Sequence, residues 1–193
     1  MDHQEIRQAI EKSIETKQTL LATPEIISVI NRVSAEMVNA FKNGKKAFFC
    51  GNGGSAADAQ HLAAELSGRF YFDRDPLPAE ALHVNTSFLT AVANDYSFAE
   101  VYKRAIKAAG REGDVLVGLS TSGNSANVVE AIKLANSLKM ITVGFTGQSG
   151  GQMKDSCQYL IAVPSSDTPR IQEAHILVGH IICEIIEKEL FGK

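Results

Sequence analysis

The sequence predicts an α/β fold in which helices cover both faces of a parallel β-sheet. From residue 45 onward, five short apolar runs alternate with segments long enough to be helices: 47–50, 79–84, 115–119, 141–145 and 159–163. Runs that are apolar on both faces are typical of strands buried on both sides, and helix-length connections are typical of parallel βαβ units. The length of 193 residues favours one domain.

Two helices are expected before the sheet. Segment 5–21 repeats isoleucine at positions 6, 10 and 14, which gives a narrow apolar stripe. Thr23 is a candidate N-cap of the second helix, Pro24 suits its first position and Gly44 suits its end. This helix has a wide apolar face, formed by Ile26, Ile30, Val33, Met37 and Phe41. The single domain therefore divides into a helical extension, 1–44, and an α/β core, 45–193, which a helix over about 170–189 closes.

Composition limits the possible partners. The net charge is −3, and the chain has no run of five basic residues, so we expect neither nucleic acid nor a membrane as a partner. No apolar stretch reaches 18 residues and the first residues are polar, which predicts a cytoplasmic protein. The three widely spaced cysteines, Cys50, Cys157 and Cys183, have apolar neighbours and are expected to be reduced packing residues.

Ligands of parallel sheets bind beyond the carboxyl ends of the strands, so the loops there are candidate sites. The loop Ser120 to Ser125 is rich in hydroxyl groups and stands between a strand and a helix over 126–138. Free backbone N–H groups and the positive helix end in such a loop favour a phosphate. The alternative is that its serine and asparagine side chains only cap the helix and shape the turn.

The second loop, 51–56, formally matches the glycine fingerprint of dinucleotide-binding proteins. The acidic residue that should bind a ribose is missing, because Val84 and Asn85 stand where it is expected, which disfavours a nicotinamide cofactor. The glycines still indicate close approach of a ligand to the backbone, and Asn52 and Ser55 could bind sugar hydroxyls.

Candidate acid and base groups follow on two helices. His61 and Glu65 lie four residues apart and share a helix face, although such pairs are also common on solvated faces. Gln172 and His180 lie about 12 Å apart along the closing helix, so they could share a ligand only if it sat between them. The other sites are left open or assigned to packing: Asn94 and Asp95 close a turn or line the pocket, His175 packs in the core, and His3 and His83 have no catalytic role.

These motifs together resemble the sugar isomerase (SIS) domain family, and within it the bacterial phosphoheptose isomerases, along essentially the whole chain. The residues that carry the resemblance are Cys50-Gly51-Asn52-Gly53-Gly54-Ser55, His61 with Glu65, Asn94-Asp95, segment 110–116, Ser120 to Ser125, and Arg170-Ile171-Gln172-Glu173 with His180. The resemblance implies a three-layer, flavodoxin-like fold with five parallel strands, a homotetramer built with the N-terminal helices, and active sites at subunit contacts.

The resemblance also implies roles for individual residues. The phosphate of a sugar-phosphate substrate would be held by Ser120, Thr121, Ser122 and Ser125. Further substrate contacts would come from Asn52, Gly53, Gly54, Ser55, Glu65, Asn94, Asp95 and Gln172. Glu65 and His180 would be the catalytic pair, and one zinc ion per subunit would bind to His61, Glu65, Gln172 and His180.

The implied reaction converts sedoheptulose 7-phosphate to D-glycero-D-manno-heptose 7-phosphate, an early step toward the heptose of lipopolysaccharide core or capsule. A ketose becomes an aldose when a proton moves between adjacent carbons through an enediol, which requires a carboxylate and a second acid/base group. Glu65 would move the carbon-bound proton, and His180 would open the ring or move protons among the oxygens. Zinc would polarise the carbonyl.

Two alternatives come from other functional classes. A non-catalytic branch of the same family binds the replication initiator DnaA as a tetramer, but it lacks the acid and the histidine that correspond to Glu65 and His180. A sugar-phosphate-binding regulator would keep the phosphate loop and have no need of Glu65. In one respect the chain departs from some relatives, since Pro169 stands where they carry an acidic residue.

Overall fold

The sheet has the expected parallel architecture. The structure is a computed structural model that describes residues 3–192. All neighbouring strands pair in parallel, in the order β2-β1-β3-β4-β5. This is the flavodoxin-like order, which confirms the predicted fold class. The strands are β1 (Ala47–Cys50), β2 (Ala79–Ala81), β3 (Val115–Leu119), β4 (Ile141–Thr146) and β5 (Tyr159–Ala162).

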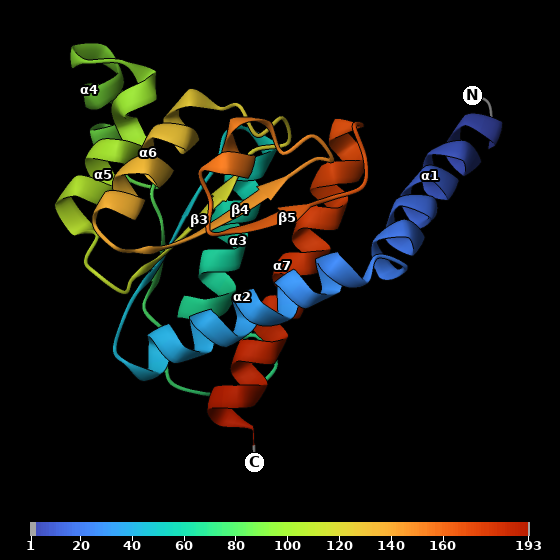
Figure 1. Cartoon of the computed structure of the whole chain (residues 1–193), viewed down its shortest axis with the longest axis horizontal. Helices are drawn as coiled ribbons and strands as arrows, with labels where there is room; N and C mark the ends of the chain where they lie inside the picture. The colour runs from blue at the N-terminus through green and yellow to red at the C-terminus, as the bar shows by residue number, and fades with distance from the viewer. Residues whose placement is uncertain (1–2, 193) are drawn as a thin grey trace.

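Helices cover both faces of the sheet, because successive strand residues point to opposite sides. Phe49 and Val117 pack in one core cluster, which also contains side chains of α2 (Pro24–Lys42), α3 (Gly54–Ser67) and α7 (Thr168–Phe191). Phe48 and Leu116 pack in the other cluster with side chains of the helices on the opposite face, α5 (Val101–Ala109) and α6 (Ala126–Ser137). The result is a three-layer α/β structure (Figure 1).

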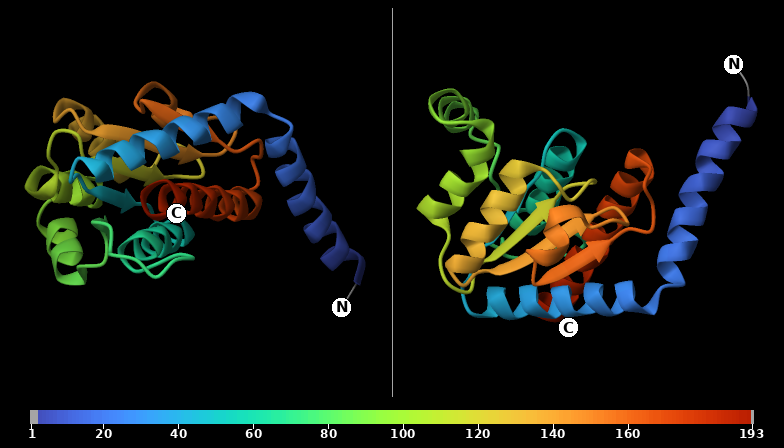
Figure 2. Two further views of the ribbon diagram at one scale, coloured as in Figure 1. Left: turned by 90° about the horizontal axis from the view of Figure 1, so that it is seen from below. Right: turned by 45° about the horizontal axis from the view of Figure 1, so that its top comes forward.

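The two N-terminal helices behave differently. Helix α2 lies on the core and buries Val33 and Met37 almost completely. Helix α1 (His3–Leu21) projects away from the core in every view (Figures 1 and 2), and its three isoleucines, Ile6, Ile10 and Ile14, are at least 50% exposed.

Two details at the ends of α2 refine the expectations for Thr23 and Gly44. Thr23 occupies the N-cap position, but its hydroxyl donates a hydrogen bond of 2.7 Å to the carbonyl oxygen of Thr19 in α1. The expected side-chain cap is therefore replaced by a bond to the preceding helix. Gly44 follows the helix end with a φ of +67°, a left-handed conformation that favours glycine.

The second strand is shorter than the predicted run 79–84. It ends at Ala81, and a turn leads to α4 (Thr86–Asp95), where the side chain of Asn85 accepts a bond from the N–H of Phe88. His83 therefore lies in the turn and not inside a strand. Two short 3-10 helices complete the fold: η1 (Phe98–Glu100) and η2 (Gly151–Asp155). None of the helices in residues 3–192 is both long and apolar enough to cross a membrane.

Candidate active site

Helices α3 and α7 contact each other on the same face of the sheet, and glycine permits their close approach at two points. A Cβ atom on Gly54 would stand 2.6 Å from the side-chain nitrogen of Gln172. A Cβ atom on Gly179 would stand 2.5 Å from the Leu62 side chain. Contacts of this kind bring the polar edge of α3 against that of α7.

Three polar side chains meet along this helix pair, and we call them the acid–base cluster: His61, Glu65 and His180. The Nε2 atoms of the two histidines are 2.9 Å apart, and His61 Nε2 is 3.1 Å from a carboxylate oxygen of Glu65. One ligand atom from each residue lies within 4.8 Å of the other two. The His61 side chain is 50% exposed and that of Glu65 is 22% exposed, so the cluster is open to a ligand.

The chemistry of the acid–base cluster suits either proton transfer or a metal ion. Without a cation, one of two facing imidazole nitrogens must donate a proton and the other must accept it. Two neutral imidazoles and a carboxylate are also a typical ligand set of a catalytic zinc ion. The Phe70 ring lies 5.6 Å from the His180 ring, centroid to centroid, and limits its movement on that side.

The hydroxyl loop, residues 120–125, lies at the carboxyl end of β3. The hydroxyl oxygens of Ser120 and Ser125 are 2.8 Å apart, and the hydroxyl of Ser122 accepts a bond from the N–H of Asn124. The Ser125 side chain thus bonds to Ser120 and does not cap α6, which weakens the alternative that these hydroxyls are only helix caps. The loop ends at the positive end of α6, as a phosphate site requires.

A groove of about 210 Å³ extends from the hydroxyl loop. Side chains and backbone from the ends of β3, β4 and β5 line it, and hydroxyl groups predominate: Thr121, Ser122, Gly147, Gln148, Ser149, Ser165, Ser166, Thr168 and Ile171. Its position beyond the carboxyl ends of the strands agrees with the general location of ligand sites in parallel sheets.

The glycine loop and the start of α6 are joined by a pair of amides. Asn52 and Asn127 exchange two hydrogen bonds of 2.9 and 2.8 Å, and Asn127 is 2% exposed. The hydroxyl of Tyr102 donates to the carbonyl oxygen of Gly51 on the same loop. Asn127 was not among the predicted site residues, although it is the one asparagine in the helical segment 126–135. The amide of Asn52 thus faces Asn127, so its predicted contact with substrate stays a prediction.

The other candidates are spread over the chain. Gln172 lies over Gly54, about two helical turns before His180, so the acid–base cluster unites three of the four predicted metal ligands. Ser55 is buried beneath the glycine loop. Asn94 and Asp95 are exposed at the end of α4, where the Asn94 amide donates to the Asp95 carboxylate, and α4 lies away from α7 in both figures.

The packing residues are as predicted. His175 is fully buried, its Nε2 atom lies 3.1 Å from the carbonyl oxygen of Thr146, and burial lowers its pKa to about 4. The three cysteines are free, and burial raises the pKa of each thiol. None of these groups is available for acid/base chemistry near neutral pH.

Comparisons with known proteins all point to the same protein family. A family model described as "SIS domain" matches residues 9–147. The chain is 51% identical to phosphoheptose isomerase of Clostridium acetobutylicum over 97% of this chain and 96% of that protein. It is also 51% identical to phosphoheptose isomerase 2 of Campylobacter jejuni over 94% of this chain and 90% of that protein.

A solved structure agrees. Phosphoheptose isomerase from Neisseria gonorrhoeae superposes with a TM-score of 0.90 and 41% identity, and the match covers 96% of this chain and 98% of that chain. Both the sequence and the fold therefore match along nearly the full length of proteins that carry the same name. The chain belongs to the phosphoheptose isomerase family of SIS domain proteins.

Proposed function

We propose that this protein isomerises sedoheptulose 7-phosphate to D-glycero-D-manno-heptose 7-phosphate and so supplies heptose for a bacterial surface glycan. The observation that carries the proposal is the acid–base cluster, because a carboxylate beside two histidines is the equipment that enediol chemistry needs. The relatives named above are phosphoheptose isomerases, which supports the same substrate. Since sugar phosphates are intracellular metabolites, we place the reaction in the cytoplasm.

Within this proposal, Glu65 removes a proton from C1 of the open-chain ketose and returns it to C2, which converts the ketose to the aldose. His180 moves the compensating proton between the oxygens on C1 and C2, so that charge does not accumulate on the enediol. His61 stands between the two groups: its Nε2 atom lies 3.1 Å from a Glu65 carboxylate oxygen and 2.9 Å from His180 Nε2.

The cluster also fits zinc. Nitrogen and oxygen ligands bind zinc at about 2.0 to 2.2 Å, so ligand atoms that lie a few ångströms apart can share one ion. Bound there, zinc would polarise the substrate carbonyl. His61, Glu65 and His180 would hold it, and Gln172 would join them only after its side chain moved from its place over Gly54.

The hydroxyl loop is the proposed phosphate site. Ser120, Thr121, Ser122 and Ser125 would bind the phosphate oxygens together with the positive end of α6. The adjoining groove, which Thr121 and Ser122 line, leaves this loop accessible to a ligand. Binding through hydroxyl groups and backbone explains how a chain of net charge −3 attracts an anionic substrate.

We further propose a homotetramer in which the exposed stripe of α1 packs against neighbouring subunits. Three isoleucines at least half exposed on one helix are an unsatisfied apolar surface. Asn94 and Asp95 would then reach the active site of a neighbouring subunit, because α4 lies away from α7 within one chain.

The catalytic proposal is tested by incubating the purified protein with sedoheptulose 7-phosphate, with and without added zinc, and measuring the aldose phosphate formed. Product formation is the expected result. If no product forms under either condition while the sugar phosphate binds, the chain is a binding protein, as a regulator or a DnaA-binding member of the family would be.

The assembly proposal is tested by sedimentation velocity. Replacing Ile6, Ile10 and Ile14 by serine should convert the tetramer to smaller species and lower activity. The matched control replaces Gln8 and Glu15, which are exposed on the opposite face of α1, by serine and should leave the tetramer intact. A tetramer that survives the triple isoleucine change would contradict the proposed role of α1.

A further inference from the structure

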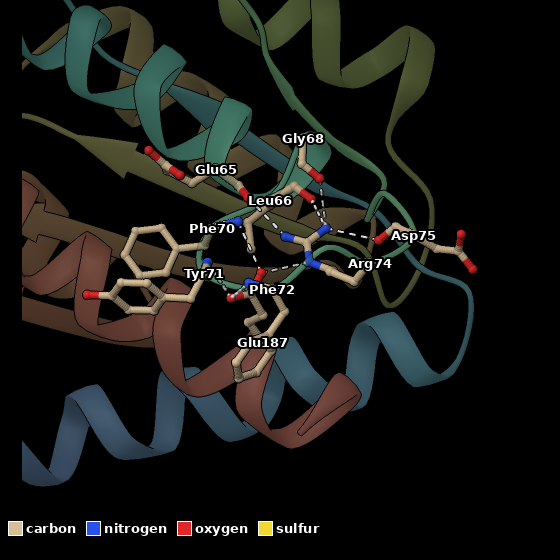
Figure 3. A network of polar contacts seen from close by, with 9 residues as sticks. All are labelled: Glu65, Leu66, Gly68, Phe70, Tyr71, Phe72, Arg74, Asp75 and Glu187. Atoms are coloured by element: carbon tan, nitrogen blue, oxygen red, sulfur yellow. Dashed lines mark hydrogen bonds and ion pairs between the residues drawn. The ribbon is translucent and has the colours of Figure 1, made fainter. Parts of the chain in front are cut away.

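A buried ion pair holds the segment that follows α3. Arg74 Nε lies 3.0 Å from a carboxylate oxygen of Glu187 on α7, and the two side chains are 2% and 1% exposed (Figure 3). Moving two charges out of water costs free energy, and this cost is offset only when the surrounding hydrogen bonds are nearly complete. The hydrogen bonds around this pair therefore show which segments it holds in place.

The Glu187 carboxylate collects three consecutive backbone N–H groups. It accepts bonds from the N–H of Phe70 at 3.0 Å, of Tyr71 at 2.6 Å and of Phe72 at 3.0 Å. Burial alone would raise the pKa of Glu187, but these donors and Arg74 outweigh it, so the pKa lies below its usual value. The carboxylate is therefore ionised and fixes the path of residues 70–72.

Arg74 completes the other half of the network. Its guanidinium donates to the carbonyl oxygens of Leu66 at 2.8 Å and Gly68 at 3.1 Å, and to that of Glu65 at 2.9 Å. The last carbonyl groups of a helix lack hydrogen-bond donors within the helix, and here the Arg74 guanidinium provides these donors. Arg74 thus fixes the backbone of α3 at the residue that carries the catalytic carboxylate.

Both halves of the network act on the acid–base cluster. Residues 70–72 place the Phe70 ring against the His180 ring, and Arg74 holds the backbone of Glu65. Figure 3 shows the ion pair between the end of α3 and the last turns of α7, with Glu65 and Phe70 attached to it.

We propose that the Arg74–Glu187 pair is a positioning element that holds Glu65 and His180 in their reactive arrangement through the backbone of α3 and the ring of Phe70. The inference rests on the proposed function, in which Glu65 and His180 are the catalytic pair. Small displacements of reacting groups lower the reaction rate strongly. Mutation of supporting residues outside the reacting set commonly lowers activity or metal affinity by about 10- to 100-fold.

Two variants test the proposal. Glu187→Gln removes the charge that organises residues 70–72. Phe70→Leu leaves the ion pair in place and removes only the ring against His180. The matched control is Glu184→Gln, on the same helix, whose exposed bond to Lys188 touches neither Glu65 nor Phe70. Glu184→Gln should behave as wild type.

The measurement must separate positioning from loss of folded protein. Titration with the reduced, alditol form of sedoheptulose 7-phosphate counts the competent sites in each preparation, and kcat is then expressed per competent site. We expect kcat per site to fall about 10- to 100-fold in both variants, with KM within about threefold of wild type. If Glu187→Gln does not fold, Phe70→Leu alone decides.

An unchanged kcat per site in Phe70→Leu and in any folded Glu187→Gln would overturn the proposal and leave the pair a purely structural role. If the wild type shows no turnover, the proposed function fails, but positioning is still read from the ring nitrogen signals of His180 in ¹H–¹⁵N spectra. A single tautomer in wild type and an averaged signal in Phe70→Leu would support positioning, and identical signals would overturn it.

Discussion

The acid–base cluster and the hydroxyl loop are both polar, but their groups are satisfied in different ways. In the cluster, two imidazole nitrogens and a carboxylate oxygen lie within 4.8 Å of one another, and these are the side-chain types that serve most often as general acids and bases. In the loop, Ser120 and Ser125 bond to each other, and neither hydroxyl titrates near neutral pH. The cluster is therefore equipped for reaction and the loop for binding.

The difference predicts how kinetic effects divide between the two regions. Interactions that strengthen only in the transition state act on kcat, whereas interactions made equally by substrate and transition state act on KM. The phosphate is remote from the carbons that exchange a proton, so its contacts change little during the reaction. Variants in the cluster should therefore lower kcat, and variants in the loop should raise KM.

The largest effect is expected for Glu65→Gln. The amide keeps the shape of the side chain and can still bond to His61, but it cannot accept the carbon-bound proton. We expect kcat to fall by about 10³-fold or more, because general acid–base catalysis contributes about 10² to 10⁴. Steady-state assays check this, and phosphate-ester binding should persist. A decrease of less than tenfold would show that another group moves the proton.

The second effect is acid destabilisation through a buried histidine. His175 lies on the same helix as His180 but is fully buried, and its pKa falls from 6.5 to about 4. Between pH 6.5 and about 4, the His175 imidazole is protonated in the unfolded chain but neutral in the folded chain. The contribution of His175 to the free energy of unfolding is therefore fully present above pH 6.5, and it decreases by about 3 kcal/mol between pH 6.5 and 4.

Urea unfolding at several pH values measures this decrease, and His175→Gln supplies the comparison. Glutamine can still donate to Thr146 but does not titrate, so the pH dependence of the unfolding free energy should be shallower by that amount. Parallel curves for the two proteins would mean that His175 does not cause the decrease.

The sequence predicts the two regions unequally. The hydroxyl loop is continuous, and residues 120–125 form it directly after a buried strand, so a local pattern is sufficient to find it. The acid–base cluster joins positions 119 residues apart, and the spacing of His61 and Glu65 alone does not distinguish it from a solvated pair. His180 could be joined to them only through the family resemblance.

What the sequence did not predict depends on tertiary contacts. The Arg74–Glu187 pair joins a loop to a distant helix, and the Asn52–Asn127 pair joins the loop after β1 to the start of α6. Strand β2 pairs with β1 alone and ends at Ala81, where the chain turns toward α4. Such features depend on which segments become neighbours, which neither periodicity nor composition encodes.

The smallest of the three effects is expected for Ser125→Ala in the hydroxyl loop. The change removes one hydroxyl from the proposed phosphate site and from its bond with Ser120, and it leaves the acid–base cluster untouched. One lost hydrogen bond to a charged group costs about 1.5 to 3 kcal/mol, so KM should rise roughly 10- to 100-fold while kcat stays within about threefold.

The matched control is Ser137→Ala at the far end of α6, where the hydroxyl donates to the carbonyl oxygen of Leu134, and it should leave both constants unchanged. Steady-state kinetics with the sugar phosphate measures kcat and KM of both variants. A decrease in kcat at unchanged KM for Ser125→Ala would show that the loop acts on the reacting carbons. The division between a reacting cluster and a binding loop would then be wrong, because one phosphate-side hydroxyl would be strengthening its contact in the transition state.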